Sequence, residues 1–261
     1  MKKLPRGIDL TVSSLADTRG VPYDLAVLPW GATEPHNLHL PYLTDAILSH
    51  AVSVDAARQA AAAGIRCMVL PPVTFGAQNP GQREQPFCIH ARYRTQFAIL
   101  EDTVVSLRLQ GLRRLVIVNG HGGNCFKNMI RDLAADYPDF TVATCEWYAL
   151  ADGRRFFDAP GEHADELETS AMLYYHPELV DMAAAGPGES HPFAMSCLNE
   201  KRVWLPRDWS RVTADTGIGN PAAATAEKGG RFVAAVLGKL VQVFTQFARE
   251  PIYCDYPHSE K

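Results

Sequence analysis

Acidic and imidazole side chains gather in two short stretches of the chain. Glu34 and His36, followed by Asp45, come after an apolar run typical of a buried strand, and His121 comes after another. In α/β proteins ligands bind at the carboxyl ends of the parallel strands, so these side chains are expected at one edge of a sheet. Carboxylate and imidazole ligands together suit Zn²⁺, Mn²⁺ or Fe²⁺. The pattern therefore predicts a metal-dependent enzyme.

Each of these residues also has a plainer structural explanation. Asp45 could only cap a helix, and His121, which stands among glycines, could belong to a turn. Glu34 and His36 lie two positions apart, so an extended segment points both the same way, whereas His39 has an odd offset and is expected to be structural. The combination favours the metal site, because two acids and an imidazole lie within twelve residues after one strand and a second imidazole follows another strand.

A third polar stretch contains His163, Glu166 and Glu168. If a helix begins here, Glu168 shares a stripe with apolar residues three and four positions later, and a buried carboxylate needs a partner such as a metal. Glu166 lies about 200° away around the helix, so we expect it to face solvent or to cap the helix. His163 precedes the helix and is free to act as a general acid or base; the alternative is a surface histidine at a helix start.

The elements that must position these residues alternate between apolar runs and helix-period segments. Predicted strands cover 25–29, 67–70, 115–118 and 141–145, and predicted helices run from Thr44 to Gly64, over 97–107, from Asn124 onwards, and over 233–244. Strands separated by helices predict a mostly parallel central sheet with helices on both faces. No linker or repeat divides residues 1–261, so we expect a single domain. Residues 183–220 are irregular and are expected to form a functional loop or a subunit contact.

Composition restricts the class of protein. The 261 residues, 47% of them hydrophobic, can bury a large core, and the net charge of -4 offers no basic surface for nucleic acid or an anionic membrane. Residues 1–5 lack the apolar stretch of a signal peptide, and no run approaches the roughly 18 apolar residues of a membrane span. The six cysteines are scattered. We expect a cytoplasmic protein that acts on a small molecule, without nucleic-acid or membrane partners.

Four blocks of the sequence resemble those of the creatininase (creatinine amidohydrolase) family. They are residues 30–41 with Thr44 and Asp45, NGHGGN at 119–124, HADELETS at 163–170, and GIGNPAAATAEKG at 217–229. The blocks follow the family order over most of the chain. The resemblance implies a compact three-layer α/β/α fold, a site for one or two metal ions, hydrolysis of a C–N bond, and a homo-oligomer.

The resemblance also implies roles for individual residues. Glu34, Asp45 and His121 match the ligands of one metal ion, and His36 matches a ligand of a second ion that shares Asp45. His163 matches the catalytic histidine of the family. For the one or two divalent ions per subunit, zinc is favoured, with manganese or iron as alternatives.

The chain departs from the family pattern near the expected pocket. Creatininase itself has a glutamate ligand at the position of Gly123, so we expect Glu168 to supply a replacement ligand and to take part in catalysis, and we expect creatinine to be a poor substrate. Segment 86–89 also differs. The residues that we expect to contact the substrate are Gln78, Arg83, His90, Gly122 and Trp147.

These observations predict a metal-dependent amidohydrolase that uses a metal-activated water to cleave an amide-type C–N bond in a small cyclic substrate. Two alternatives stay open. The polar loop 74–92 suits a polyhydroxylated substrate, and some family subgroups resemble hydrolases that open inosose-type ring ketones at a C–C bond. The other is a catalytically inactive, metal-stabilised binding or scaffold protein, for which loss of His163 or Glu168 would be expected; both are present.

Overall fold

A parallel four-stranded sheet with the order β2-β1-β3-β4 forms the centre of the computed structural model, which describes residues 5–159 and 161–254. Its strands are β1 (Leu25–Trp30), β2 (Cys67–Val69), β3 (Arg114–Asn119) and β4 (Thr141–Glu146). In register, Val27 of β1 pairs with Val69 of β2 and with Val116 of β3. The strands predicted from the apolar runs are therefore confirmed. The expectation about a leader peptide concerned residues 1–5, of which residues 1–4 lie outside the described residues.

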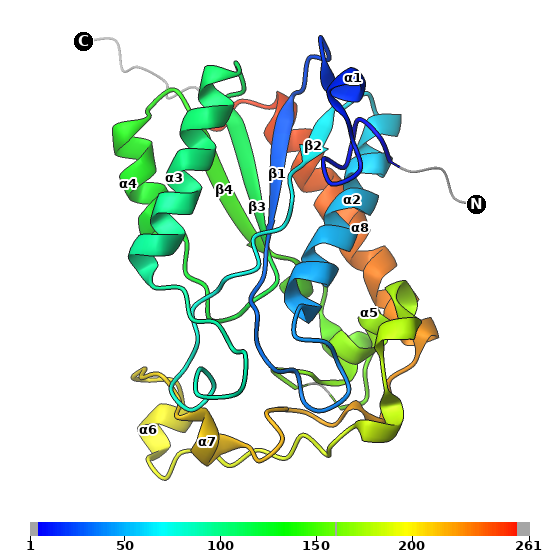
Figure 1. Ribbon diagram of the computed structural model, residues 1–261, viewed down its shortest axis with the longest axis vertical. Helices are drawn as coiled ribbons and strands as arrows, with labels where there is room; N and C mark the ends of the chain where they lie inside the picture. Colours follow the sequence, from blue (N-terminus) through cyan, green and yellow to red (C-terminus); the bar gives the residue numbers. More distant parts are fainter. Residues whose placement is uncertain (1–4, 160, 255–261) are drawn as a thin grey trace.

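Helices cover both faces of this sheet (Figure 1). One face carries α3 (Tyr93–Leu109) and α4 (Lys127–Asp136), and the other carries α2 (Thr44–Ala62), α5 (Glu166–Tyr175) and α8 (Ala226–Arg249). Every residue of β1 is buried, as expected for a strand covered on both sides. The predicted three-layer α/β/α architecture is confirmed.

The remaining elements are short. They are α1 (Leu15–Thr18), α6 (Ser196–Asn199) and α7 (Trp209–Val212), with 3-10 turns at Trp147–Ala149, Gly153–Arg155, Pro177–Leu179, Met182–Ala184 and Pro221–Ala223. Segment 183–220 is mostly irregular, as expected, and runs beside loop 74–92 at the end of the molecule where the strands finish (Figure 1). The helix expected from Asn124 begins instead at Lys127, because the Asn124 side chain donates to Gly31 O and accepts from Ala77 N.

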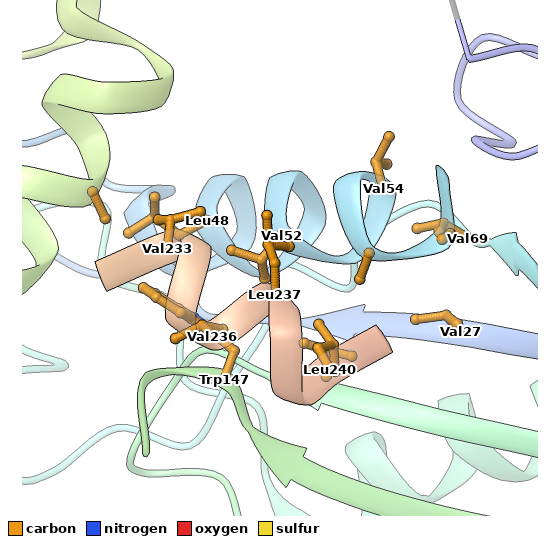
Figure 2. Packing of buried hydrophobic residues seen from close by; sticks show 14 of the residues in the cluster. Val27, Leu48, Val52, Val54, Val69, Trp147, Val233, Val236, Leu237 and Leu240 are labelled. Atoms are coloured by element: carbon orange, nitrogen blue, oxygen red, sulfur yellow. The ribbon is translucent and has the colours of Figure 1, made fainter. Parts of the chain in front are cut away.

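Helix α8 is the longest helix of the described chain, and by length and composition it could cross a membrane, with a mean hydropathy of 1.2 over an 18-residue window. In this fold its apolar residues lie on one face and pack against α2, α5 and the sheet (Figure 2). Buried residues on that face include Phe232, Val236 and Leu240. The helix begins at a Thr225 cap, whose hydroxyl accepts from Lys228 N.

Two glycines bring the start of α2 against the strand ends. A Cβ atom on Gly31, directly after β1, would overlap the backbone N of Ala46, and one on Gly120, directly after β3, would lie 2.5 Å from Asp45 O. Only glycine permits so close a backbone approach. The contact places Asp45 at the edge of the sheet where β1 and β3 end.

Candidate metal centre and active site

Six ionisable side chains meet beyond the carboxyl ends of β1 and β3. Candidate ligand atoms lie within 4.8 Å of one another in three overlapping groups, which are Glu34–Asp45–His121, His36–Asp45–Glu168 and Glu34–His36–His163. Glu168 is half-buried and the other five are buried. The structure thus brings together all five side chains expected to bind metal, with His163 beside them.

The backbone orients the imidazole of His121. Its Nε2 lies 2.7 Å from Ala77 O and therefore carries the proton, because a carbonyl can only accept. In the neutral ring the Nδ1 lone pair then faces Glu34 Oε1 at 3.0 Å and Asp45 Oδ2 at 3.2 Å. A lone pair opposite two carboxylate oxygens is repulsive unless a proton or a metal cation lies between them.

His36 and His163 repeat this arrangement. His36 Nδ1 donates to Glu34 O at 3.1 Å and its Nε2 lies 3.0 Å from Asp45 Oδ1. His163 Nε2 donates to Pro35 O at 2.9 Å, and its Nδ1 lies 3.7 Å from Glu34 Oε1. Backbone carbonyls that select a tautomer and aim the other nitrogen inward are typical of metal-binding histidines. The geometry is compatible with His163 either as a ligand or as an acid–base group.

The electrostatics of the cluster favour a bound cation. Burial opposes protonation of His36, yet Asp45, Glu168 and Glu34 raise its pKa to about 10. The pKa of His121 is also raised, by Glu34 and Asp45 against the effect of burial. Among the described residues, Glu34 Oε1 and Asp45 Oδ2 are buried without a hydrogen-bond partner of good geometry. Such oxygens, with two inward imidazole nitrogens, form a donor set that fits a divalent metal ion.

The two glutamates of α5 differ from expectation in one respect. Glu168 reaches the cluster as expected; its Oε2 accepts from Ala164 N at 2.6 Å, and burial, with Asp45, raises its pKa to about 8. Glu166 was expected to face solvent or cap the helix, which is wrong. It is fully buried, accepts from the backbone N of residues 158 and 159, and forms an ion pair with Lys228 of α8. Because α5 is covered on more than one side, it has no solvent-facing stripe at Glu166.

His39 lies outside the metal cluster. It is buried, and its Nε2 lies within hydrogen-bond distance of Thr169 Oγ1, at 2.8 Å. This position ties the segment after β1 to α5. The expected structural role agrees with these contacts.

A cavity of about 800 Å³ opens beside the cluster. Glu34, His121 and His163 form part of its wall, and Gln78 and Gly122, both expected to contact substrate, also line it. Both polar atoms of the Gln78 amide are buried without a partner among the described residues. The cavity therefore has both ionisable and uncharged polar groups at the point where a substrate would bind.

Three other expected contact residues do not line this cavity. Arg83 pairs with Glu84 at the surface, at 3.1 Å. His90 Nδ1 accepts from Gln78 N at 2.8 Å, so His90 organises the loop. Trp147 is 1% exposed and packs beside α8 (Figure 2), with its ring centroid 6.2 Å from that of Phe232. The tight turn after β4 directs Trp147 into the core.

The structure adds Tyr148 and Trp209, which the sequence patterns did not single out, and gives Gln82 of the polar loop 74–92 a specific partner. Tyr148, next to Trp147, lies near Gly122, where a Cβ would be 3.7 Å from its hydroxyl; its place after β4 was the available signal. Gln82 Nε2 donates to Glu34 Oε2. The Trp209 ring packs edge-on against His163, with centroids 5.7 Å apart. No local pattern marks Trp209, because it reaches the site from the irregular segment.

Comparisons with known proteins agree with this geometry. The family model "Creatininase: Creatinine amidohydrolase" matches residues 9–244. A mycofactocin precursor peptide peptidase of Mycolicibacterium smegmatis is 30% identical over 223 residues, covering 82% of this chain and 81% of the relative. The creatinine amidohydrolase of Pseudomonas putida is 26% identical over 226 residues, covering 78% and 82%.

Solved structures show the same fold. A protein from Bacteroides fragilis, provisionally named a creatinine amidohydrolase, is 57% identical, with a TM-score of 0.93 over 95% of this chain and 98% of that one. A creatininase variant complexed with creatine has a TM-score of 0.77 at 21% identity, over 92% and 98%. Structures of creatininase in manganese and in zinc forms share the fold as well.

Proposed function

The chain belongs to the creatininase family and is a hydrolase, and on this basis we propose that it is a metal-dependent amidohydrolase. Its proposed reaction is hydrolysis of an amide-type C–N bond in a small cyclic substrate other than creatinine. The observation that carries the proposal is the set of inward-facing nitrogens on His36, His121 and His163, each opposite a buried carboxylate. Relatives named as an amidohydrolase and as peptide peptidases support the amide bond.

The proposed ligands divide into two sets that share Asp45. Glu34, Asp45 and His121 would hold one divalent ion, and His36, Asp45 and Glu168 a second. Zinc and manganese are the candidates, since creatininase structures exist in both forms. A divalent ion in such a site supplies an activated water and polarises a carbonyl group. Backbone carbonyls orient the imidazoles of His36 and His121, so both proposed ligand sets are held in place before any ion binds.

His163 is the proposed proton carrier. Its Nε2 stays bonded to Pro35 O, so Nδ1, which faces the site, is the atom that would take up and release a proton. Burial, with nearby His36, lowers the pKa of His163 below its usual range, which keeps the ring neutral and able to accept a proton. Transfer to the leaving nitrogen would then return the ring to its starting state.

Position 123 supports a substrate other than creatinine. A Cβ on Gly123 would overlap Ala77 O and lie 2.5 Å from His121 Nε2, so a glutamate side chain does not fit there in this fold. The second ligand set would therefore differ from that of creatininase. Because the metal ligands and the pocket residues both differ from those of creatininase, we expect a cyclic substrate other than creatinine.

One observation favours the alternative substrate. Four uncharged carboxamides line the cavity, and three of them, those of Gln78, Asn79 and Gln82, come from loop 74–92. Carboxamides both donate and accept hydrogen bonds, so they also suit the hydroxyl groups of an inosose-type cyclic polyol ketone. Hydrolytic ring opening at a C–C bond is therefore the second candidate reaction.

The test is turnover by metal-loaded protein supplied with a panel of cyclic amides, creatinine and inosose-type ketones, followed by mass spectrometry. We expect hydrolysis of a cyclic amide and little turnover of creatinine. His163→Ala should lower kcat by about 10²–10⁴-fold with metal content unchanged. His176→Ala, at an exposed histidine, is the matched control.

Three outcomes would change the proposal. Near-wild-type kcat in His163→Ala would remove His163 from the mechanism, and loss of metal would make it a ligand. Robust creatinine hydrolysis would overturn the substrate assignment. Absence of turnover on the whole panel, with metal removal affecting only stability, would favour a metal-stabilised binding or scaffold protein.

A further inference from the structure

A second cavity, of about 1070 Å³, adjoins the one beside the metal-binding cluster. Glu162, Leu205, Pro206 and Arg207 line both cavities and so form the partition between them. The two cavities meet at these residues, so a substrate too long for the first cavity would reach the second beside them. The space available exceeds what a single small ring would fill.

Arg207 occupies a distinctive place in this partition. It is the only lysine or arginine among the described residues that line the cavity beside the cluster. Its guanidinium lies over the Trp209 ring, 4.9 Å from the centroid, and Trp209 in turn contacts His163 edge-on. Trp209 is buried and held by bonds from its N to Pro80 O and from its Nε1 to Thr216 O. The buried Trp209 ring therefore supports the guanidinium and lies between it and His163, the proposed proton carrier.

The current partner of Arg207 is exchangeable. Its Nη2 lies 2.7 Å from Glu162 Oε2, but the Arg207 side chain is 31% exposed and that of Glu162 is 50% exposed. Ion pairs this exposed contribute little to stability, so a substrate carboxylate could replace Glu162. An arginine fork binds carboxylates in a bidentate way, and such bonds strengthen where water is excluded. Besides Arg207 and Glu162, the second cavity is lined by two basic residues, Lys201 and Arg211, and one acid, Asp208. This excess of positive charge would attract an anion from that side.

We infer that Arg207 is a specificity-determining residue that binds a carboxylate group of the substrate, and that the second cavity receives the part of the substrate beyond it. The inference rests on the proposed function only for the bond that is cleaved in that substrate. Recognition of the carboxylate does not depend on it, because Arg207 lies outside the metal-ligand sets.

The experiment compares matched ligands that differ only in this charge. Pyroglutamate and pyroglutamamide form one pair, and short N-acetylated dipeptides with a free or an amidated C-terminus form the others. Binding to metal-loaded protein is measured by calorimetry. We expect at least one pair in which the carboxylate binds about tenfold more tightly or better, as a charge-assisted bidentate contact provides.

Variants assign the effect to this residue. Arg207→Gln should remove the carboxylate preference, and Glu162→Gln should increase it because the competing acid is lost. Arg202→Gln, at an exposed arginine that lines neither cavity, should keep the wild-type preference. If Arg207→Gln does not fold, the direction of the Glu162→Gln change still decides the question.

The outcomes separate this inference from the proposed function. A carboxylate preference that disappears in Arg207→Gln supports the inference even if no amide is hydrolysed. Equal affinity within every pair, no binding of any pair, or a preference that persists in Arg207→Gln would overturn it. Hydrolysis of a neutral cyclic amide without a carboxylate preference would support the proposed function alone.

Discussion

At the scale of single residues, the two glutamates of α5 have different surroundings. Glu168 lies beside His36 and Asp45, whereas Glu166 is held by Lys228 and two backbone N–H groups. Glu168→Gln should therefore lower the metal bound per subunit. Glu166→Gln should lower the denaturation midpoint and leave the metal content unchanged. Elemental analysis and thermal unfolding of both variants check this, and full metal content in Glu168→Gln would exclude that residue as a ligand.

Also at the residue scale, the space around Gly123 limits which acid could complete the proposed second ligand set. We expect Gly123→Glu to lower stability and metal binding instead of restoring a creatininase-type ligand, because its Cβ would overlap Ala77 O and crowd the His121 ring. Gly122→Ala is the control, since its Cβ would meet only Tyr148 Oη, at 3.7 Å. The measurements are unfolding midpoint, metal content and creatinine turnover. A stable, metal-loaded Gly123→Glu protein that hydrolyses creatinine would refute this explanation.

At the scale of elements, the contact between α5 and α8 depends on a glycine. Alanine in a helix interior is normally more stable than glycine by about 1 kcal/mol. At Gly229, however, a Cβ would overlap Ser170 O, and forced overpacking costs about 1–3 kcal/mol. Gly229→Ala should therefore lower the free energy of unfolding. Gly238→Ala in the same helix should raise it, because an added Cβ there would meet no atom of another described element within 4 Å. Urea titrations measure the free energy of unfolding of both variants. An equal increase in the two would contradict the close contact between Gly229 and Ser170.

At the scale of the whole molecule, the proposed metal-binding cluster joins segments 34–45, 119–124 and 163–168, which are far apart in the chain. Removal of metal by a chelator should lower the melting temperature, because buried carboxylates lose their counter-charge. It should also create a pH dependence. In the metal-free protein the pKa of His36 is raised from 6.5 to about 10, so its stabilising charge is fully present below pH 6.5 and lost as pH rises through about 10.

Melting temperatures measured between pH 6.5 and pH 10 check this prediction. The metal-free protein should lose stability steadily over that window, and the metal-loaded protein should lose less. Reloading with zinc or manganese should restore the higher melting temperature. Identical pH profiles with and without metal would show that the cluster does not hold an ion.

Much of the site was predictable because its signals are local. Apolar runs mark strands that are buried on both faces, and polar residues directly after such runs must lie at the carboxyl edge of a parallel sheet. Glu34, His36, Asp45 and His121 come together for that reason. Tyr148 obeys the same rule, whereas its neighbour Trp147 points into the core, and the sequence does not show which way a short turn directs each side chain.

The sequence by itself determined the parallel sheet, the order of strands and helices along the chain, and the residues that arrive at one edge, because these follow from periodicity and chain order. Only the tertiary structure decided the burial of Glu166, since its partner Lys228 comes from another helix. The same holds for Trp209, which the long segment 183–220 brings against His163, and for Arg207, which lies over the Trp209 ring. Such contacts join segments tens of residues apart, and no local pattern encodes the packing that brings them together.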